Sequence, residues 1–560
     1  MKKILDIFLS FAFVWLSAGC EKADGVIPVQ GLSVKPEMFM TISGSSTIQV
    51  SVVPENANGD YKLVWTSSDR SVAVVAADGT VTAVSEGKAI ITAVLDGNRS
   101  VKASCKITVS ADMSKYVQFE DERFEKAVLA VADKDGDGRV SREEALEVKK
   151  LMVIGLYIKS LAGIECFENL EWLDCSMNAI KTGCMDLSRN KALKVLNCSG
   201  NASLKELDVT FNTALVALNC KGTGISSLDV SKNIGLTHLN CYYNNLPSLD
   251  LSRNTALEFL SCGCNLFTSL DLTHNTALKT LECTFAKLES IDLSKNTALE
   301  NLDVRCGVFK SIDVRANTEL RMLHVQYNHA ISSLDVSQNI KLRSLCTAQN
   351  AISSLDLSKC PDIDSLWVDG NGYTGEGKMT ELDLSNNLSL VWLRCENQKI
   401  KSLKLAHTKI DYLKCSDNAL EELTVPSSLT YLKCSVNRIP VLDLSACNSL
   451  RWVECSGNGI SELKVNASKG LMGLLCGGNR LTSLDLSGLG SIWKLECYNN
   501  RLASLDISGN ETLKFVKCSG NHDLKEIYVW EGFEPDEMTW DQGEKPCYEK
   551  DPGACWVVKD

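Results

Sequence analysis

The sequence predicts a multidomain protein whose largest part is a long solenoid of short repeats, with a parallel β-sheet on its concave face. The main observation is a period of 21 residues, at which one aspartate recurs as Asp208, Asp229, Asp250, Asp271, Asp292 and Asp313. A coil this short cannot bury its own leucines, so neighbouring coils must stack into one continuous core. Two further observations are a strand-like pattern near the N-terminus and an aspartate-rich loop between two helical segments.

Within the solenoid, predicted for residues 151–530, each coil contributes one short strand. Leu281 and Cys283 alternate with Glu282 and Thr284. We therefore expect the first pair to face the core and the second pair to face outward. The position of Cys283 recurs as a column, whose members are Cys175, Cys198, Cys220, Cys241, Cys262, Cys283, Val304, Val325, Thr347, Val368, Cys395, Cys415, Cys434, Cys455, Cys476, Cys497 and Cys518.

We predict that the column cysteines are buried free thiols, and neither disulfides nor metal ligands. Side chains on adjacent parallel strands lie about 4.8 Å apart, whereas the Cβ atoms of a disulfide lie about 3.8 Å apart. Valine and threonine also occupy the column, which suits a small apolar position but not a metal ligand. Three residues further on, most coils carry an asparagine such as Asn265, whose amide we expect to bond the turning backbone.

The repeat Leu-x-x-Leu-x-Cys-x-x-Asn-x-Leu, which residues 257–267 follow with Phe267 in place of the last leucine, is similar to the leucine-rich repeat signature. Its cysteine-bearing, 21-residue form resembles the repeats of internalin-type bacterial adhesins. This resemblance implies a leucine-rich repeat fold with a small helical cap before the first coil. It leaves the ligand open.

Residues 1–19 combine Lys2 and Lys3 with an apolar run and a small-residue segment, which is typical of a secretory signal peptide. The small residues that lead into Cys20 resemble a bacterial lipoprotein cleavage site. The resemblance implies that Cys20 becomes the lipidated first residue, followed by a linker at 20–27. We therefore expect an exported lipoprotein of a Gram-negative outer membrane, facing the exterior and held to the membrane by its lipid alone.

Residues 28–110 alternate threonine, serine and valine in short runs, with Asp78-Gly79 as a turn signal, and predict a succession of β-strands. The segments Trp65–Asp69 and Val72–Val75 resemble the bacterial Ig-like group 2 domain. The resemblance implies a β-sandwich, which we expect to act as a stalk.

Residues 111–150 form the predicted helical cap, and its loop has the spacing of an EF-hand. The expected ligands are Asp133, Asp135, Asp137, Arg139 through its carbonyl, Ser141 and Glu144. Three carboxylates and a bidentate glutamate suit a hard cation that prefers oxygen. We expect one structural calcium ion, and not a calcium sensor, because a single loop is present where EF-hands usually pair.

Residues 531–560 depart from the repeat and are expected to cover the open end of the solenoid. Cys547 and Cys555 are eight residues apart in a chain that we expect to be exported, where disulfides are stable. The sequence leaves both alternatives open, a disulfide or two free thiols.

The composition excludes several classes of function. The formal net charge is −12 and no basic tract is present, which argues against nucleic acid as a partner. The sequence contains no metalloprotease, serine-hydrolase or phosphate-loop motif, and its six histidines are scattered. We therefore expect a protein that is not an enzyme, and one that is a monomer.

The outward strand positions are the informative ones, because core packing does not constrain them. Aromatic residues occupy one outward position in four consecutive coils, and we expect an exposed aromatic row beside a mostly cationic row. The predicted ligand surface consists of Trp367, Trp392, Arg394, Tyr412, Lys414, Tyr431, Lys433 and Trp452. Contiguous aromatics usually mark a binding surface; the alternative is a self-stacking row that only stabilises the sheet. A glycine-rich insertion at 370–377 precedes this surface.

We predict non-catalytic recognition of a host or microbial macromolecule, or adhesion to it, through a protein or glycan bound on the concave face. The alternative is a glycan-binding accessory lipoprotein of a nutrient-uptake system, since rows of tryptophan and tyrosine suit sugar faces as well as proteins.

Overall fold

The structure, a computed structural model, describes residues 26–42, 44–110, 115–370, 377–405, 407–465, 467–534 and 547–559. The predicted signal peptide and Cys20 lie outside these residues. The chain forms two compact units, Met1–Tyr116 and Val117–Asp560. Among the described residues, no helix combines the length and the apolar character that crossing a membrane requires.

The first unit is the predicted β-sandwich. Its strands are β1 (Gly31–Val34), β2 (Glu37–Thr41), β3 (Ser45–Thr47), β4 (Val50–Val53), β5 (Leu63–Ser67), β6 (Ala73–Val75), β7 (Thr80–Ala83), β8 (Gly87–Leu95) and β9 (Asn98–Ser110). They form a four-stranded sheet in the order β2-β9-β8-β5, a three-stranded sheet β3-β7-β6 and the pair β1-β4.

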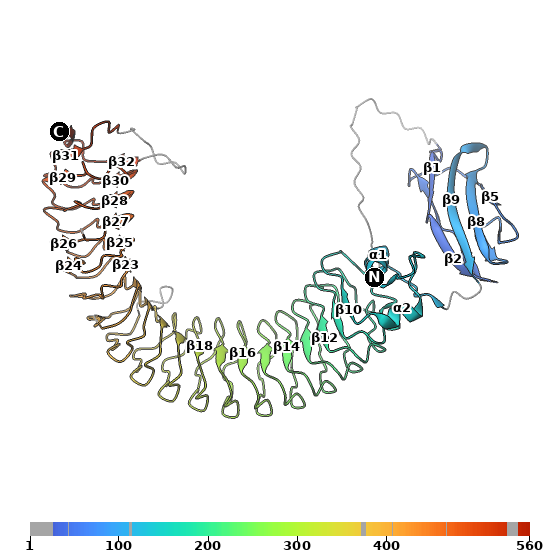
Figure 1. The fold of residues 1–560 in the computed structure, drawn as a ribbon, viewed down its shortest axis with the longest axis horizontal. Coiled ribbons are helices and arrows are strands. Elements are labelled where there is room, and N and C mark those ends of the chain that lie inside the picture. Colours follow the sequence, from blue (N-terminus) through green and yellow to red (C-terminus); the bar gives the residue numbers. More distant parts are fainter. Residues whose placement is uncertain are drawn as a thin grey trace. The chain divides into compact units, whose positions relative to one another are not determined.

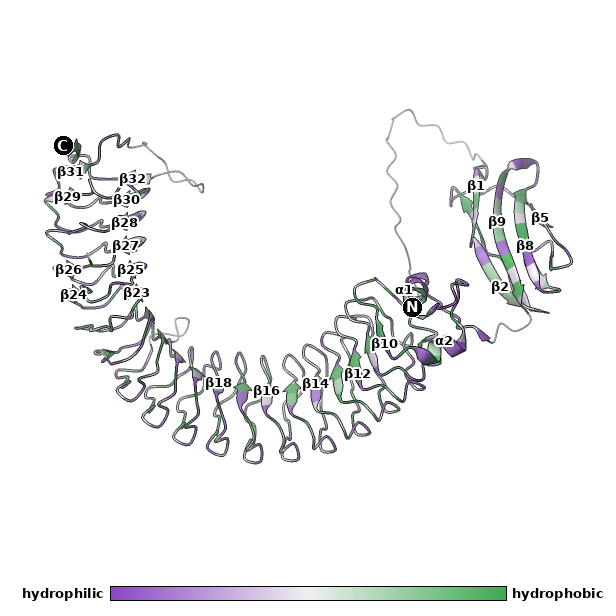
Figure 2. Ribbon diagram, in the orientation of Figure 1, coloured by the Kyte–Doolittle hydropathy of each residue, from purple (hydrophilic) through white to green (hydrophobic). Residues whose placement is uncertain are grey.

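Alternation of residue type gives these strands one buried face. Hydrophobic and hydrophilic segments alternate along β8 and β9 (Figure 2), and Ala89, Ile91 and Ala93 of β8 are buried. The predicted turn at Asp78-Gly79 is present: Gly79 has φ +84°, and a Cβ atom there would lie 2.6 Å from the ring of Trp65. Glycine is therefore required both for the backbone conformation and for the close approach of the tryptophan.

The second unit begins with two helices, α1 (Glu122–Ala132) and α2 (Arg142–Glu147). The Asp121 carboxylate accepts hydrogen bonds from the first turn of α1, which is the usual role of an N-cap. Phe124 and Val128 of α1 are buried in the same hydrophobic cluster as Leu151 of the first coil. The helices therefore cover the open end of the repeat core, as the sequence predicts.

The solenoid forms a continuous parallel sheet of 19 strands, which runs along the inner side of the curved repeat (Figure 1). Its strands are β10 (Lys150–Met152), β11 (Trp172–Asp174), β12 (Val195–Asn197), β13 (Ala217–Asn219), β14 (His238–Asn240), β15 (Phe259–Ser261), β16 (Thr280–Glu282), β17 (Asn301–Asp303), β18 (Met322–His324), β19 (Ser344–Cys346), β20 (Ser365–Trp367), β21 (Trp392–Arg394), β22 (Tyr412–Lys414), β23 (Tyr431–Lys433), β25 (Trp452–Glu454), β27 (Gly473–Leu475), β28 (Lys494–Glu496), β30 (Phe515–Lys517) and β32 (Cys547–Glu549).

Smaller parallel sheets lie elsewhere in the later coils. They consist of β24 (Val441–Asp443) with β26 (Glu462–Lys464), and of β29 (Ser504–Asp506), β31 (Glu526–Val529) and β33 (Cys555–Val558).

The register of the large sheet places equivalent residues of successive coils side by side, as Leu260, Leu281 and Leu302 show. The column residues follow these leucines, and all thirteen column cysteines are free and buried. The predicted free-thiol column is therefore confirmed. Burial of each leucine stabilises the fold by roughly 1.5–3 kcal/mol, so the repeat core dominates the stability of this unit.

The asparagine column also has the predicted structural role. The side-chain amide of Asn479 donates to the carbonyls of Cys455 and Cys476, at 3.0 and 2.9 Å, and its oxygen accepts from the N–H of Ile460 at 3.1 Å. Each such amide therefore satisfies backbone groups of two coils. A second buried column, which includes Asn254 and Asn275, donates to backbone carbonyls on the return side of the coil.

The repeated aspartates organise the return turn. The carboxylate of Asp250, for example, accepts a hydrogen bond of 2.9 Å from the N–H of Ser252. Hydrogen bonds from Ser252 hold the pKa of Asp250 below its ordinary value. The repeated aspartate is therefore a turn residue, as the sequence predicts, and its repetition has a structural cause.

The C-terminal segment extends the sheets of the solenoid, because β32 pairs with β30 and β33 pairs with β31. Cys555 is a free, exposed cysteine, and its strand belongs to a different sheet from the strand of Cys547. The structure therefore does not form the disulfide that the sequence left open; the side chain of Cys547 lies outside the described residues.

The buried thiols predict a loss of stability at alkaline pH. Burial raises the pKa of Cys198, Cys241 and Cys434 from 9.0 to about 12. Below pH 9 both folded and unfolded thiols are protonated, so their contribution is complete. As the pH rises from 9 to about 12, the unfolded thiols ionise and the folded ones do not, which costs about 1.4 kcal/mol per thiol and pH unit.

Unfolding midpoints measured between pH 8 and 11 should fall steeply above pH 9. Replacing Cys434 by valine, the residue at column position Val325, should make the fall shallower by the contribution of one thiol. Alkylation of the native protein at pH 8 should spare the column and modify Cys555. A column cysteine that is alkylated as fast as Cys555 would contradict this account.

Candidate functional site

The predicted ligand surface lies on five adjacent strands of the 19-stranded sheet, β20 to β23 and β25. Trp392, Tyr412, Tyr431 and Trp452 occupy equivalent positions in the register, and Trp367 pairs with Arg394 in the adjacent position. Leu393, between Trp392 and Arg394, is fully buried. The alternation of the strand therefore turns the predicted residues away from the core, and the structure brings all of them together on one face.

The aromatic residues form a stack, and they are half-buried where the sequence predicted full exposure. The ring centroids of Trp392 and Tyr412 lie 5.6 Å apart with planes 9° from parallel, and those of Tyr412 and Tyr431 lie 4.6 Å apart at 15°. Trp452 lies over Gly473, where a Cβ atom would be 2.3 Å from its ring, and contacts Trp493. The self-stacking alternative is therefore correct for the geometry of the row.

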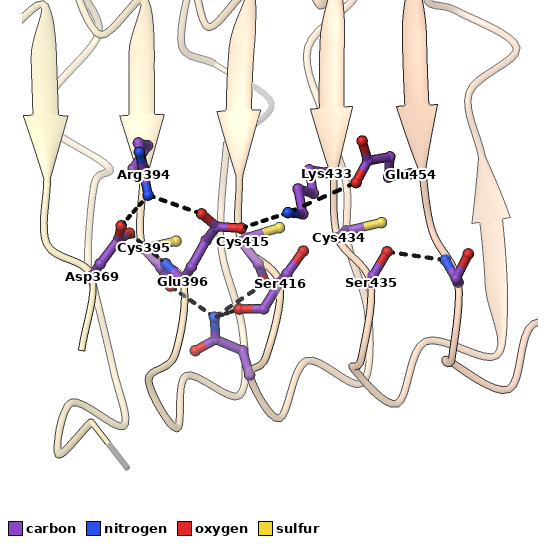
Figure 3. A network of polar contacts seen from close by, with 12 residues as sticks. Asp369, Arg394, Cys395, Glu396, Cys415, Ser416, Lys433, Cys434, Ser435 and Glu454 are labelled. Carbon is purple, nitrogen blue, oxygen red and sulfur yellow. Dashed lines mark hydrogen bonds and ion pairs between the residues drawn. The ribbon is translucent and has the colours of Figure 1, made fainter. Parts of the chain in front are cut away.

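Two of the three cations beside this row are paired with carboxylates, which the sequence prediction did not include (Figure 3). The Arg394 guanidinium lies 2.6 Å from Asp369 and 3.1 Å from Glu396. Lys433 lies 3.7 Å from Glu396 and 3.8 Å from Glu454. The mostly cationic row is thus joined to the acids of the next outward position in one network of charges.

Aromatic side chains also take part in this network. The indole N–H of Trp367 donates to Asp369, and that of Trp452 donates to Glu454 at 2.8 Å. The Arg394 guanidinium lies 4.7 Å from the centroid of Trp367, and the Lys414 ammonium lies 5.5 Å from Tyr412. Each predicted residue therefore has its orientation set by a neighbour, which is what a preorganised surface requires.

Burial perturbs the carboxylates of this network. Burial raises the pKa of Asp369 although Arg394 opposes the rise. Burial, followed by the charge of Asp369, raises the pKa of Glu396. Only 4% of the Asp369 side chain and 10% of the Glu396 side chain are exposed. The two acids follow the column by one residue, so the same alternation that selected Arg394 could have identified them in the sequence.

The glycine-rich insertion lies next to this surface in the sequence, and its residues 371–376 are outside the described part of the chain. Gly370 and Gly377 flank it, and a Cβ atom at Gly370 would lie 1.8 Å from the carbonyl oxygen of Asn397. Glycine is therefore required where the insertion leaves the coil.

The predicted calcium loop joins α1 to α2 and is close to a cation-binding geometry. Asp133, Asp135 and Asp137 each offer a carboxylate oxygen, and these oxygens lie within 4.8 Å of one another. Glu144 accepts from the backbone of Lys134 and, as part of the α2 capping box, from Ser141. Although burial raises the pKa of Glu144, these hydrogen bonds hold it below its ordinary value.

The donor set therefore fits a hard divalent cation, because oxygen ligands from the loop converge and Glu144 already holds the two ends of the loop together. The carboxylates also accept hydrogen bonds within the loop, for example Asp133 from the N–H groups of Gly136 and Gly138 at 2.8 and 3.0 Å. Hydrogen bonds from its own backbone N–H groups thus hold the loop in this conformation, and a bound cation would stabilise it further.

Fold and site together define a solenoid of the leucine-rich repeat architecture with an Ig-like domain. The family model described as bacterial Ig-like domain (group 2) matches residues 28–107. The chain is similar to the functional domain of InlJ from Listeria monocytogenes, whose description includes a cysteine ladder. The two are 28% identical with a TM-score of 0.54, over 74% of this chain and 82% of that one.

Two more distant structures share the fold alone. YopM from Yersinia enterocolitica WA-314 is 21% identical with a TM-score of 0.58, over 78% of this chain and 94% of that one. The plant peptide hormone receptor RGFR1, in complex with RGF2, is 18% identical with a TM-score of 0.51, over 68% and 74%. No curated protein matches the chain.

Replacement of Arg394 by alanine should strongly destabilise the coils around it. The change leaves Asp369, whose side chain is 4% exposed, without its cation, and breaking a buried pair in this way costs about 3–5 kcal/mol. Lys414→Ala is the matched control, since Lys414 contacts rings and contributes about 0.5–1 kcal/mol.

Urea unfolding of the two variants provides the comparison. Adding Asp369→Asn to Arg394→Ala should recover part of the loss, because no uncompensated charge remains. Equal midpoints for Arg394→Ala and Lys414→Ala would contradict a structural role for the network.

Proposed function

We propose that this chain is an exported, lipid-anchored surface protein that recognises a protein partner, without catalysis, on the concave face between Trp367 and Trp452. The observation that carries the proposal is the continuous row of half-buried aromatic and charged side chains across adjacent strands. Residues of these types dominate binding energy in protein interfaces. The likeness to the functional domain of InlJ supports the same class of role.

A protein partner fits this row better than a glycan. Sugars bind aromatic side chains by packing their C–H groups on a free ring face. In the row, the faces of Tyr412 are covered by Trp392 and Tyr431, at 5.6 and 4.6 Å, so ring edges and hydroxyl groups remain. Edges, hydroxyls and fixed charges suit the polar and aromatic side chains of a protein surface.

Truncation of the row should weaken binding of the partner. The variant Tyr412→Ala with Tyr431→Ala removes two central rings, and loss of such anchors costs at least about 2 kcal/mol, or about thirtyfold in affinity. Pull-down from host-cell and microbial surface extracts identifies the partner, and titration of purified partner measures the change.

The control is His238→Ala with Phe259→Ala. These residues occupy the same strand position in earlier coils, on paired strands, and also stack, at 6.0 Å and 18°. Both double variants lose a comparable stack of rings. A difference in affinity between them is therefore caused by lost contacts with the partner and not by a general disturbance of the sheet. If no extract protein binds, or if the two variants bind equally well, the proposed surface is wrong.

The lipid anchor is proposed from the run of small residues into Cys20. Replacing Cys20 by serine should prevent lipidation and move the protein from the membrane fraction to the soluble fraction, because no other anchor is proposed. Fractionation with a lipid-labelling assay measures this outcome. Unchanged membrane retention of the serine variant is the contrary result.

The cap loop is proposed to bind one calcium ion, which stabilises the junction between α1 and α2. Single extracellular sites of this kind bind at roughly 10⁻⁴–10⁻³ M, so millimolar calcium should raise the unfolding midpoint and release heat in calorimetry. Glu144→Ala should abolish the calcium-induced shift, and Glu147→Ala, on the same helix, should retain it.

The quantity to compare is the shift on adding calcium, because Glu144 also caps α2 and its loss lowers stability without calcium. If millimolar calcium produces no heat and no stabilisation in the parent protein, the site is excluded.

A further inference from the structure

A hollow of about 500 Å³ lies on the concave face in the middle coils, apart from the aromatic stack. Its lining comes from successive coils and is formed by Lys221, Asn240, Tyr242, Ser261, Glu282, Thr284, Phe285, Asp303, Arg305, Cys306, Gln326, Tyr327 and Trp367. A volume of this size is typical of a ligand pocket.

Small residues open the hollow at its centre. Ser261 and Thr284, on outward positions of two neighbouring coils, line it. Beside them, a Cβ atom at Gly263 would lie 2.1 Å from the carbonyl oxygen of Thr284, so glycine is required where the two coils approach each other. Tyr242 and Tyr327 lie four strands apart, which is about 19 Å along the sheet.

One aromatic side chain of the hollow, Phe285, retains a free ring. It is 54% exposed and stacks on no aromatic ring within the described chain. The other rings are held by neighbours: Tyr327 meets Trp367 edge to face, at 6.3 Å and 84°, and Tyr242 has the Lys221 ammonium 5.0 Å from its centroid. The thiol of Cys264 also donates to the hydroxyl of Tyr242 at 3.2 Å.

The backbone places Phe285 at a position that is left-handed in most coils, two residues after the column. Glycine satisfies this conformation at Gly200, Gly222 and Gly457, and non-glycine residues such as Met177 and Val436 adopt it in other coils. Phe285 has φ +54°, in a region that bulky side chains rarely occupy. Glycine would relieve this strain and remove an exposed apolar ring.

The charged groups of the hollow balance, and Arg305 forms an ion pair with Asp303 at 3.2 Å. Lys221 and Arg305 oppose Glu282 and Asp303, so neither sign of ligand charge is selected. The carboxylate of Glu282 makes no hydrogen bond or ion pair with any described residue. Gln326 is 3% exposed and its amide oxygen lacks a partner within the described chain, which is unfavourable unless a donor meets it.

From these observations we propose that the hollow between Tyr242 and Tyr327 is a binding site for a neutral oligosaccharide. The free ring of Phe285 would pack on the C–H face of a sugar ring, and Glu282, Asn240 and Gln326 would bond the hydroxyl groups. This site shares Trp367 with the protein-binding row, but its central residues Phe285, Glu282 and Gln326 lie outside that row.

Calorimetric titration of the purified full chain with a panel of neutral hexasaccharides, built from glucose, mannose, xylose, galactose or N-acetylglucosamine, tests the proposal. At least one should bind. Phe285→Gly should lower its affinity at least tenfold, with the unfolding midpoint unchanged or raised because strain is relieved. Glu282→Gln should weaken binding severalfold without altering the midpoint.

Val436→Gly is the matched control. Val436 holds the same coil position with φ +56° and is 54% exposed, but it lies outside the hollow. Its glycine variant should bind the sugar as the parent does, and so should Tyr412→Ala with Tyr431→Ala, whatever their effect on the protein partner.

The proposal is overturned if no hexasaccharide of the panel binds, if Phe285→Gly binds like the parent, or if Val436→Gly loses as much affinity. Binding of an octa-arginine peptide that depends on Phe285, without sugar binding, would also overturn it and identify a protein-binding pocket. None of these outcomes bears on the row, whose test uses the protein partner.

Discussion

The stacking of one coil on the next is the interaction on which the rest of the structure depends. Leucines bury the interior, and asparagine amides such as Asn479 bond the carbonyls of their own coil and of the preceding one. Backbone groups that turn out of the sheet would otherwise be buried without partners. Because each coil contacts only its neighbours, every coil must repeat the same buried residues, while the outward positions are free to vary.

Some of these outward positions carry charged residues that are partly buried in the folded protein. Asp369 and Glu396 have raised pKa values because of burial, and Arg394 joins them. A buried ion pair gives little net stability compared with an apolar core. Its effect here is to hold Trp367 and Arg394 in one arrangement. These side chains therefore lose less conformational entropy when a partner binds.

The same separation of structure from recognition appears in the left-handed residue of each coil. The turn requires a positive φ, and glycine satisfies it in several coils without strain. Phe285 meets the same requirement with an exposed ring. The backbone therefore determines the conformation at this position, while the side chain varies from coil to coil, for example between Met177, Phe285 and Val436.

Features that repeat with the coil could be predicted from the sequence alone. The solenoid, the buried thiol column, the amide column and the aspartate turns follow from residue type at a fixed period, because every coil meets the same environment. The clustering of Asp133, Asp135 and Asp137 in one loop and the turn at Gly79 are equally local, since all their determinants lie within a few residues of one another.

The pairing of side chains between coils was decided only by the tertiary structure. Whether Tyr412 is exposed or stacked, and whether Arg394 is free or bound to Asp369, depends on strand register and on side-chain direction across an insertion of irregular length. The hollow at Gly263 needs small residues on neighbouring coils at once, and the last strands join the sheet through a segment without the repeat. These features arise from residues distant in sequence, and single-coil periodicity carries no information about them.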